Sequence, residues 1–146
     1  MQPFNILTQR VNRPDAVEKV KGQAKFTADL ILPGMLTGKI LRSTRHHARI
    51  LNLDTSPALK VPGVKAVIAA KDLPPVVYGF GDRRADMTVF AIDRVRYKGD
   101  EIAAVAAVDE DAATEALDRI VVEYEDLPAV FDPEEAVKKG APQLHD

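Results

Sequence analysis

The chain has 146 residues, of which 46% are hydrophobic and 29% are charged, and this composition is typical of a globular domain. Its 20 basic and 22 acidic side chains almost cancel, so no strong field of one sign is available to attract nucleic acid or an anionic membrane. The lack of cysteine excludes disulfides, thiolate metal sites, iron–sulfur ligation and cysteine nucleophiles in this chain.

Neither a targeting segment nor a membrane span is expected. The longest apolar run, Ile102 to Val108, is far shorter than the roughly 20 residues that cross a bilayer. The N-terminus lacks the continuous apolar core of a secretory signal. We therefore expect a cytoplasmic protein.

Residues 1–16 differ from the rest of the chain, because they are polar, contain Pro3 and Pro14, and show neither a helical nor a strand period. Such a segment predicts an extended N-terminal arm that packs on another surface. The remaining residues, 17–146, are expected to form one domain.

Strands dominate the predicted domain. Alternating apolar and polar side chains, or short apolar runs, predict strands at residues 36–42, 48–54, 64–70, 94–98, 101–108 and 120–127. The runs at 64–70 and 101–108 are almost wholly apolar, so these two strands are expected at the centre of the sheet with both faces covered. Lys98-Gly99-Asp100 predicts a hairpin between the two strands that flank it.

Three short helices are expected at residues 56–60, 110–120 and 133–139. The second is the clearest, because Asp109 can cap it and Ala113, Ala116 and Leu117 share one of its faces. Adjacent strands with few helices between them indicate an α+β fold, which we expect to hold one mixed sheet of about six strands and two to three short helices.

The segment from Lys71 to Val89 is the best candidate site. It is long for a connection inside a compact domain, and long loops often carry binding surfaces. Its Gly79-Phe80-Gly81-Asp82 could suggest a phosphate-binding loop, but no helix and no Lys-Ser/Thr follows, so a flexible surface loop is the better interpretation.

A basic cluster is the second candidate. His46 and His47 are adjacent, so on a strand they point to opposite faces and cannot share a metal ion. With Arg42, Arg45 and Arg49 they could hold a phosphate or an acidic partner surface. The simpler interpretation is a solvated turn with one histidine packed beneath it.

Two pairs of acids could in principle serve acid/base chemistry. Glu123 and Glu125 share one face of a predicted strand, and Asp100 and Glu101 lie at the mouth of a buried strand, where burial could perturb a carboxyl group. A solvated edge and a turn carboxylate are the simpler interpretations. No serine lies in a nucleophile elbow. The residues by themselves therefore indicate an α+β domain with one candidate loop and no complete catalytic site.

Five segments follow one another in a familiar order: VEKVKGQAKFTADL, GKILRSTRHHARI, LDTSPALKVPGVKAVIAAKDLP, VFAIDRVRYKGDEIAAVAAVDEDAATEALDRIVVEYEDLPAV and PEEAVKKGAPQLHD. Together they resemble the N-terminal part of the molybdopterin-binding large subunit of the xanthine dehydrogenase/aldehyde oxidase superfamily. Within it, the opening segment and RYKGDEIAAVAAV look most similar to the large subunit of 4-hydroxybenzoyl-CoA reductase. The resemblance implies the α/β hammerhead fold.

Members of this superfamily carry a molybdenum pterin cofactor and pass electrons through iron–sulfur clusters and usually FAD. Their cofactor-binding and catalytic residues lie in later domains, so the resemblance implies no catalytic, cofactor-binding or metal residue in this chain. It implies that the chain packs on the molybdenum domain and the iron–sulfur subunit, with a flavin subunit as a further partner in many members.

The resemblance also implies that the long loop lines the substrate channel. Tyr78 and Phe80 are then candidate wall residues, and Arg83 and Arg84 are candidate contacts for an anionic substrate. The implied substrates are aldehydes, heteroaromatic compounds or aromatic CoA esters. The alternative is a stand-alone binding or scaffold module that kept the hammerhead fold without enzymatic activity.

Overall fold

The computed structural model describes residues 11–79 and 85–145 of the chain. Contacts divide the chain into two compact units, residues 1–33 and 34–146. The described part of the first unit contains helix α1 (Ala16–Val20) and the 3-10 helix η1 (Thr27–Asp29). The arm expected over residues 1–16 lies mostly outside the described residues, and its division from a domain over residues 17–146 stays a prediction.

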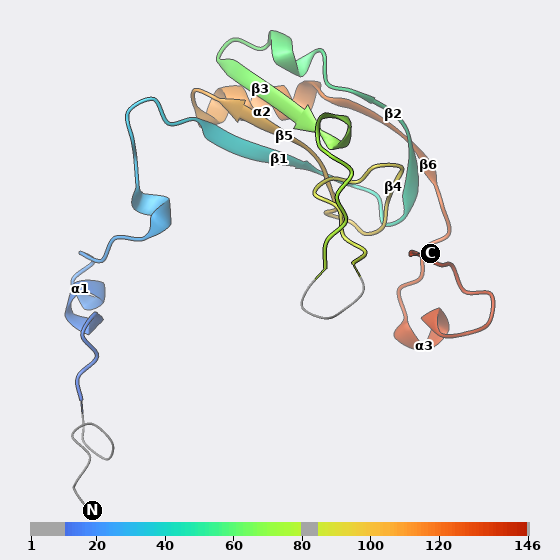
Figure 1. Cartoon of the computed structure of the whole chain (residues 1–146), viewed down its shortest axis with the longest axis horizontal. Coiled ribbons are helices and arrows are strands. Elements are labelled where there is room, and N and C mark those ends of the chain that lie inside the picture. The colour runs from blue at the N-terminus through green and yellow to red at the C-terminus, as the bar shows by residue number, and fades with distance from the viewer. Residues whose placement is uncertain (1–10, 80–84, 146) are drawn as a thin grey trace, which may run out of the picture. The chain divides into compact units, whose positions relative to one another are not determined.

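The described part of the second unit contains six strands, the number predicted. They are β1 (Thr37–Arg42), β2 (Ala48–Asp54), β3 (Val64–Ala69), β4 (Arg94–Val95), β5 (Glu101–Ala107) and β6 (Val121–Asp126). They form two three-stranded antiparallel sheets, in the orders β1-β5-β3 and β4-β2-β6 (Figure 1). The α+β class is confirmed, and the single mixed sheet expected from the sequence is wrong.

The turn at residues 98–100 connects the two sheets and does not close a hairpin. Strand β4 pairs with β2, where Val95 lies opposite Ala48, whereas β5 pairs with β1 and β3. The Asp100 carboxylate accepts a hydrogen bond from the Arg96 N–H at 2.9 Å, which shapes this turn. The predicted hairpin is wrong because both strands find partners that are distant in the sequence.

Strand β5 lies at the centre of its sheet. Its residues Ile102, Ala103, Val105 and Ala107 are at most 2% exposed, which confirms the prediction of a strand covered on both faces. Strand β3 instead lies at an edge of the sheet, and its Ile68 is 41% exposed. The central position predicted for β3 is therefore wrong, because an apolar run alone does not separate a central strand from an edge strand with an apolar outer face.

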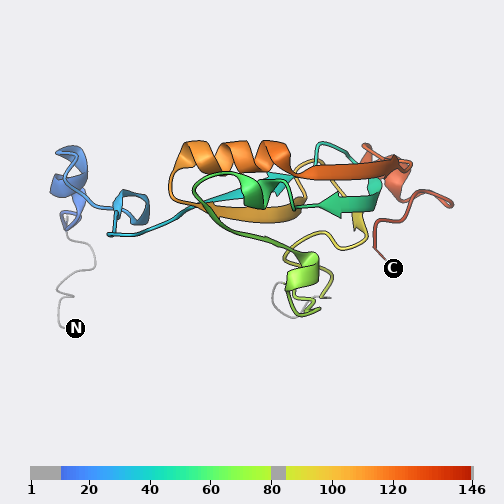
Figure 2. The same cartoon turned by 90° about the horizontal axis from the view of Figure 1, so that it is seen from above.

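Helix α2 (Glu110–Arg119) covers one face of the β1-β5-β3 sheet (Figure 2). The Asp109 side chain accepts a hydrogen bond from the Ala112 N–H at 2.8 Å and caps the helix, as predicted. Ala116 is fully buried against Ala103 and Val105 of β5, because its small side chain allows the helix to approach the sheet closely.

A second core cluster joins the two sheets, since Ile102 of β5 packs with Ala48, Ala91 and Val95 around the β4-β2-β6 sheet.

The two remaining predicted helices are shorter than expected. The first is the 3-10 helix η2 (Ala58–Lys60), and the second is α3 (Pro133–Ala136), whose first turn is capped by a 2.7 Å hydrogen bond from the Glu134 N–H to the Asp132 carboxylate.

Candidate functional site

In the segment that follows β3, the described residues 71–79 and 85–89 form two arms that pair at a neck. The segment starts within the 3-10 helix η3 (Ala70–Asp72). The Tyr78 N–H donates to the Met87 carbonyl at 2.9 Å, and the Met87 N–H donates to the Tyr78 carbonyl at 3.0 Å. We refer to residues 71–89 as the neck loop. In Figure 2 its two described arms extend on the side of the strands opposite to α2.

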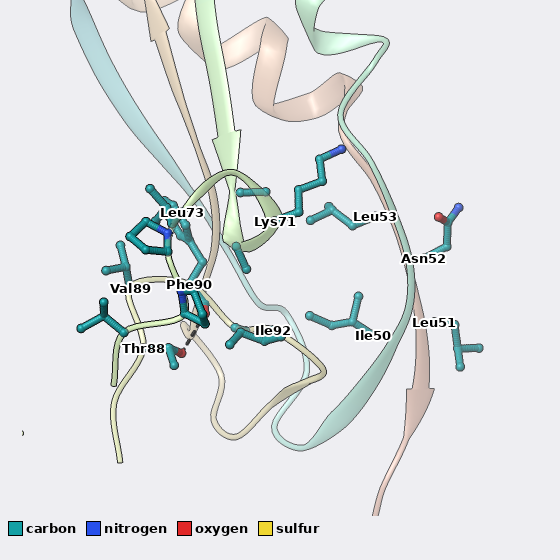
Figure 3. A pocket seen from close by; sticks show the side chains of 16 residues that line it. Ile50, Leu51, Asn52, Leu53, Lys71, Leu73, Thr88, Val89, Phe90 and Ile92 are labelled. Carbon is teal, nitrogen blue, oxygen red and sulfur yellow. Dashed lines mark hydrogen bonds between the residues drawn. The ribbon is translucent and has the colours of Figure 1, made fainter. Parts of the chain in front are cut away.

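A pocket of about 420 Å³ lies between β2 and the two arms of the neck loop (Figure 3). It is lined by residues 50–53, 69–71, 73–76 and 88–92. Most of these side chains are aliphatic or aromatic, and only Asn52, Lys71 and Thr88 are polar. Such a lining suits an uncharged apolar group.

The polar groups of this pocket do not form a catalytic set. The Thr88 hydroxyl donates to the Phe90 carbonyl at 2.8 Å, so it is used to shape the loop. No aspartate, glutamate or histidine lines the pocket, so its described residues supply no general acid or base. As described, the pocket can bind and orient an apolar group.

The structure places one of the four predicted channel residues and does not bring the four together. Tyr78 lies at the neck of the loop and is 43% exposed. Phe80, Arg83 and Arg84 lie outside the described residues. The channel role of these four residues therefore stays a prediction.

The β2 side of the pocket was missed by the sequence analysis. Ile50, Leu51 and Leu53 were assigned only to a strand, yet these near-continuous apolar residues cover both faces of β2 and were a signal that both faces meet other groups. Their opposition to residues 88–92 follows from the tertiary fold and has no local signature.

The arginines of the basic cluster are paired with acids of the two sheets. Arg42 pairs with Glu101, Arg45 with Asp126 and Arg49 with Glu125, at N–O distances of 2.5, 3.3 and 2.6 Å. These pairs neutralise the cluster, so the structure favours the solvated turn over a site for phosphate. Glu125, one of the two carboxylates on β6 considered for acid/base chemistry, is therefore used in the ion pair with Arg49.

The two histidines of this turn have different surroundings. His47 is 6% exposed, and its Nδ1 donates to the Pro128 carbonyl at 2.7 Å, while the Leu127 N–H donates to the His47 carbonyl at 2.9 Å. His46 is exposed and its ring packs edge-on against Phe131, with the ring centroids 5.0 Å apart. One histidine therefore packs beneath the turn, as expected, and holds the chain after β6.

The pKa values of Asp100 and Glu101 are shifted in opposite directions. Burial raises the pKa of Asp100 above its ordinary value, against the hydrogen bond from the Arg96 N–H. Burial is the largest single influence on Glu101 and opposes its ionisation. The hydrogen bonds from Arg42, the Glu101 backbone and Tyr97, together with the charge of Arg42, outweigh burial, so the pKa of Glu101 lies below its ordinary value. Neither side chain lines the pocket, so these acids shape the β4–β5 turn and hold β1 to β5.

Within residues 11–79 and 85–145, no three histidine, aspartate or glutamate side chains lie close enough together to hold a metal ion. No helix in these two ranges is long and apolar enough to cross a membrane.

Residues 21–128 match the a/b hammerhead domain of aldehyde oxidase and xanthine dehydrogenase. The chain belongs to this hammerhead family. It is 47% identical over 134 residues to a probable xanthine dehydrogenase subunit of Bacillus subtilis, and 41% identical over 142 residues to the nicotinate dehydrogenase large molybdopterin subunit of Eubacterium barkeri. These matches cover 92% and 97% of this chain but 18% and 33% of the two relatives. The hammerhead domain thus corresponds to a limited part of each.

Solved structures share the fold of this hammerhead domain. Reconstituted CO dehydrogenase from Oligotropha carboxidovorans superposes with a TM-score of 0.80 at 37% identity, over 90% of this chain and 17% of that one. The aldehyde oxidoreductase from Desulfovibrio gigas superposes with a TM-score of 0.79 at 33% identity, over 91% of this chain and 16% of that one. The predicted hammerhead fold is confirmed.

The comparisons support the superfamily and do not support the narrower resemblance. The relatives named above are xanthine, nicotinate and CO dehydrogenases and an aldehyde oxidoreductase, and none of them is a 4-hydroxybenzoyl-CoA reductase. The RYKGDEIAAVAAV segment forms β5 and the turn before it, which belong to the fold that these proteins share.

A molybdenum pterin cofactor does not fit the pocket beside the neck loop. Such a cofactor needs hydrogen-bond donors for its phosphate and its pterin ring, and the pocket offers mainly aliphatic and aromatic side chains. This pocket therefore assigns no cofactor contact.

Proposed function

We propose that this chain serves as the hammerhead part of a molybdenum-dependent oxidoreductase of the xanthine dehydrogenase type. In this role it supplies structure, interfaces and one wall of the substrate channel, and it is not catalytic alone. The proposal depends on the family match over residues 21–128, together with the limited share of each relative that the chain spans. The catalytic and cofactor-binding groups then belong to other parts of the enzyme.

The proposed partners follow from this role. The chain packs on the molybdenum-cofactor domain or subunit and on an iron–sulfur subunit, with a flavin subunit in assemblies that use FAD. The molybdenum pterin, iron–sulfur clusters and FAD are held by those partners. A cytoplasmic location remains part of the proposal.

We place the channel wall at the neck loop and its pocket. The apolar lining along residues 50–53 and 88–92 supports contact with a flat, weakly polar substrate such as an aldehyde or a heteroaromatic compound. Tyr78 and Phe80 provide aromatic faces for such a substrate in the proposal, and Arg83 and Arg84 a charge for an anionic one. An aromatic CoA ester is the narrower alternative, and the relatives named above do not favour it.

A genetic experiment in the host tests the proposal. Deletion of the coding region should abolish one dehydrogenase activity in cell extracts assayed with xanthine, nicotinate, aldehydes, carbon monoxide and 4-hydroxybenzoyl-CoA. The same activity should be lost when the wild-type host grows with tungstate in place of molybdate, and the intact chain should restore it. Unchanged activities in the deletion strain would contradict the proposal and favour a stand-alone scaffold.

The channel role has its own test in the restored strain. Tyr78→Ala should change the KM of the affected activity more than its kcat, because Tyr78 contacts substrate in the proposal without taking part in bond breaking. Tyr97→Ala is the matched control, since Tyr97 is 52% exposed, compared with 43% for Tyr78, and lies outside the neck loop. Equal effects of both variants would contradict a channel role for the neck loop.

A further inference from the structure

The centre of the face of the β1-β5-β3 sheet opposite to α2 carries only small or aliphatic residues. Leu41, Val67, Ala69, Ala103 and Val105 pack into the core on the α2 side. Because neighbouring residues of a strand point to opposite faces, the alternate residues point away from α2. These are Gly38 and Ile40 of β1, Ala104 and Ala106 of β5, and Ala66 and Ile68 of β3, which we call the outer face.

The outer face is open within the described part of the chain. Ile40 is 44% exposed and Ile68 is 41% exposed, while Ala104 and Ala106 are half-buried. A solvated face of an antiparallel sheet normally carries polar side chains at alternate positions. The six residues of the outer face include none. The nearest charged side chains of these strands are Arg42, next in the alternation on β1, and the exposed Lys65, beside Ala66 in the bulge of β3. The centre of this face therefore has the composition of a covered surface.

The other sheet of the same molecule provides a direct contrast. Arg49 of β2 and Glu125 of β6 are register partners, and their exposed side chains form an ion pair at 2.6 Å. A charged pair therefore occupies neighbouring solvated positions of that sheet, whereas the aligned positions of the outer face carry aliphatic side chains.

The outer face has the shape of a shallow trough along β5. Its register aligns Ile40, Ala104 and Ile68 in one row, so the smallest side chain lies in the middle. In the next row Gly38 lies beside Ala106, and a Cβ atom at Gly38 would meet only the Val105 carbonyl, at 3.9 Å. Two such troughs would leave a gap if they faced each other, so a second copy of this chain fits poorly. A convex element with large side chains fits well.

Polar groups border the end of the trough. Arg42 and Glu101 form an ion pair at the end of β1 and β5, and the Tyr97 hydroxyl donates to the Glu101 carboxylate at 3.2 Å. An apolar centre with a polar rim is the usual anatomy of a protein interface. A centre without any charge is typical of permanent contacts and less so of contacts that form and separate.

The relatives indicate which partner can cover such a surface. In CO dehydrogenase and in aldehyde oxidoreductase the hammerhead domain is 17% and 16% of one longer chain. A contact inside one folded chain is permanent, which matches the uncharged centre of the outer face.

We propose that the outer face is covered by the molybdopterin-binding part of the large subunit, which inserts bulky aliphatic or aromatic side chains between Ile40 and Ile68. This inference rests on the proposed function and adds the surface through which the two parts meet. It requires that the outer face become inaccessible in the assembled enzyme while exposed apolar residues elsewhere on the domain stay accessible.

Single cysteines test this requirement, because the chain has none of its own. Ile40→Cys and Ile68→Cys should react rapidly with a maleimide in the isolated chain, as should the control Leu59→Cys on η2, which is 54% exposed. In the tagged assembly purified from the host, the reaction of the first two should slow by about tenfold or more, and that of the control should not. Ala66→Cys, also exposed, repeats the measurement if one of the isoleucine variants does not fold.

A photo-reactive amino acid in place of Ile68 identifies what covers the outer face. The expected cross-link joins it to the polypeptide that binds molybdopterin. A cross-link to a second copy of this chain or to the iron–sulfur subunit would overturn the inference, as would rapid labelling at residues 40 and 68 in an assembly that contains molybdenum. An assembly without molybdenum would overturn the proposed function as well, so the two failures can be told apart.

Discussion

Gly63 joins η2 to β3 at a point where the fold leaves no room for a side chain. Its φ is +91°, and a Cβ atom there would lie 2.8 Å from Val108 Cγ2 and 3.3 Å from Ala112 Cβ. A left-handed backbone costs an L-residue about 1–2 kcal/mol, and overpacking typically costs about 1–3 kcal/mol. We therefore expect Gly63→Ala to lower the free energy of unfolding by about 2–5 kcal/mol.

Two further variants separate the causes of this loss. Gly99 has a φ of +104°, and a Cβ atom added there would meet nothing within 4 Å, so Gly99→Ala should cost only the backbone term, about 1–2 kcal/mol. Val108→Ala removes the atom that clashes and should restore part of the stability of Gly63→Ala. Urea unfolding followed by circular dichroism measures the natural chain, the two glycine variants and the double variant. Equal losses for the two glycine variants, or no recovery in the double variant, would refute the steric argument.

Three further substitutions probe the core, the α2 cap and a buried acid. Ile102→Ala should lower the free energy of unfolding by about 2–5 kcal/mol, because Ile102 is fully buried where the two sheets meet. Ile40→Ala, at an exposed position, should lower it much less. Similar losses for the two variants in urea unfolding would argue against this core. Asp109→Ala should lower the free energy of unfolding by about 1 kcal/mol, and Asp109→Asn should lower it less, since asparagine can still cap α2. An unchanged urea midpoint for Asp109→Ala would show that the cap does not stabilise the domain. Burial raises the pKa of Asp100 in the folded chain, so the folded state binds this proton more tightly than the unfolded state does. The contribution of Asp100 to the free energy of unfolding therefore falls as the pH rises from the ordinary value of 3.8 through the raised pKa. Relative to Asp100→Asn, the natural chain should therefore lose stability across that window, and parallel curves for the two proteins would contradict the shift.

Local signals in the sequence predicted helix α2 and five of the six strands closely. The Asp109 cap and the spacing of Ala113 and Ala116 act within a few residues, so the sequence specifies α2 almost independently of the fold. Strand pairing depends on distant partners, and that is where prediction failed. Val95 pairs with Ala48, 47 positions earlier in the chain, so the short β4 left no local pattern that could reveal its sheet.

The sequence predicted only part of the candidate site, because the rest of the site also depends on residues that are distant in the sequence. The length of the neck loop marked it as a binding surface, but its pocket exists only because the fold brings residues 50–53 of β2 beside residues 88–92. The outer face also escaped the sequence analysis. The alternation of Gly38 and Ile40 with polar neighbours was visible, yet only the position of α2 on the opposite side shows that this apolar set is the exposed one.

The central claim is that this chain works inside a molybdenum enzyme. The most direct test is the ratio of molybdenum to chain in the assembly purified from the host under native conditions through a tag on this polypeptide. We predict equimolar molybdenum and a mass well above the 16.0 kDa of the chain, with a molybdopterin-binding polypeptide in the assembly. A stable 16.0 kDa monomer without molybdenum would contradict the claim.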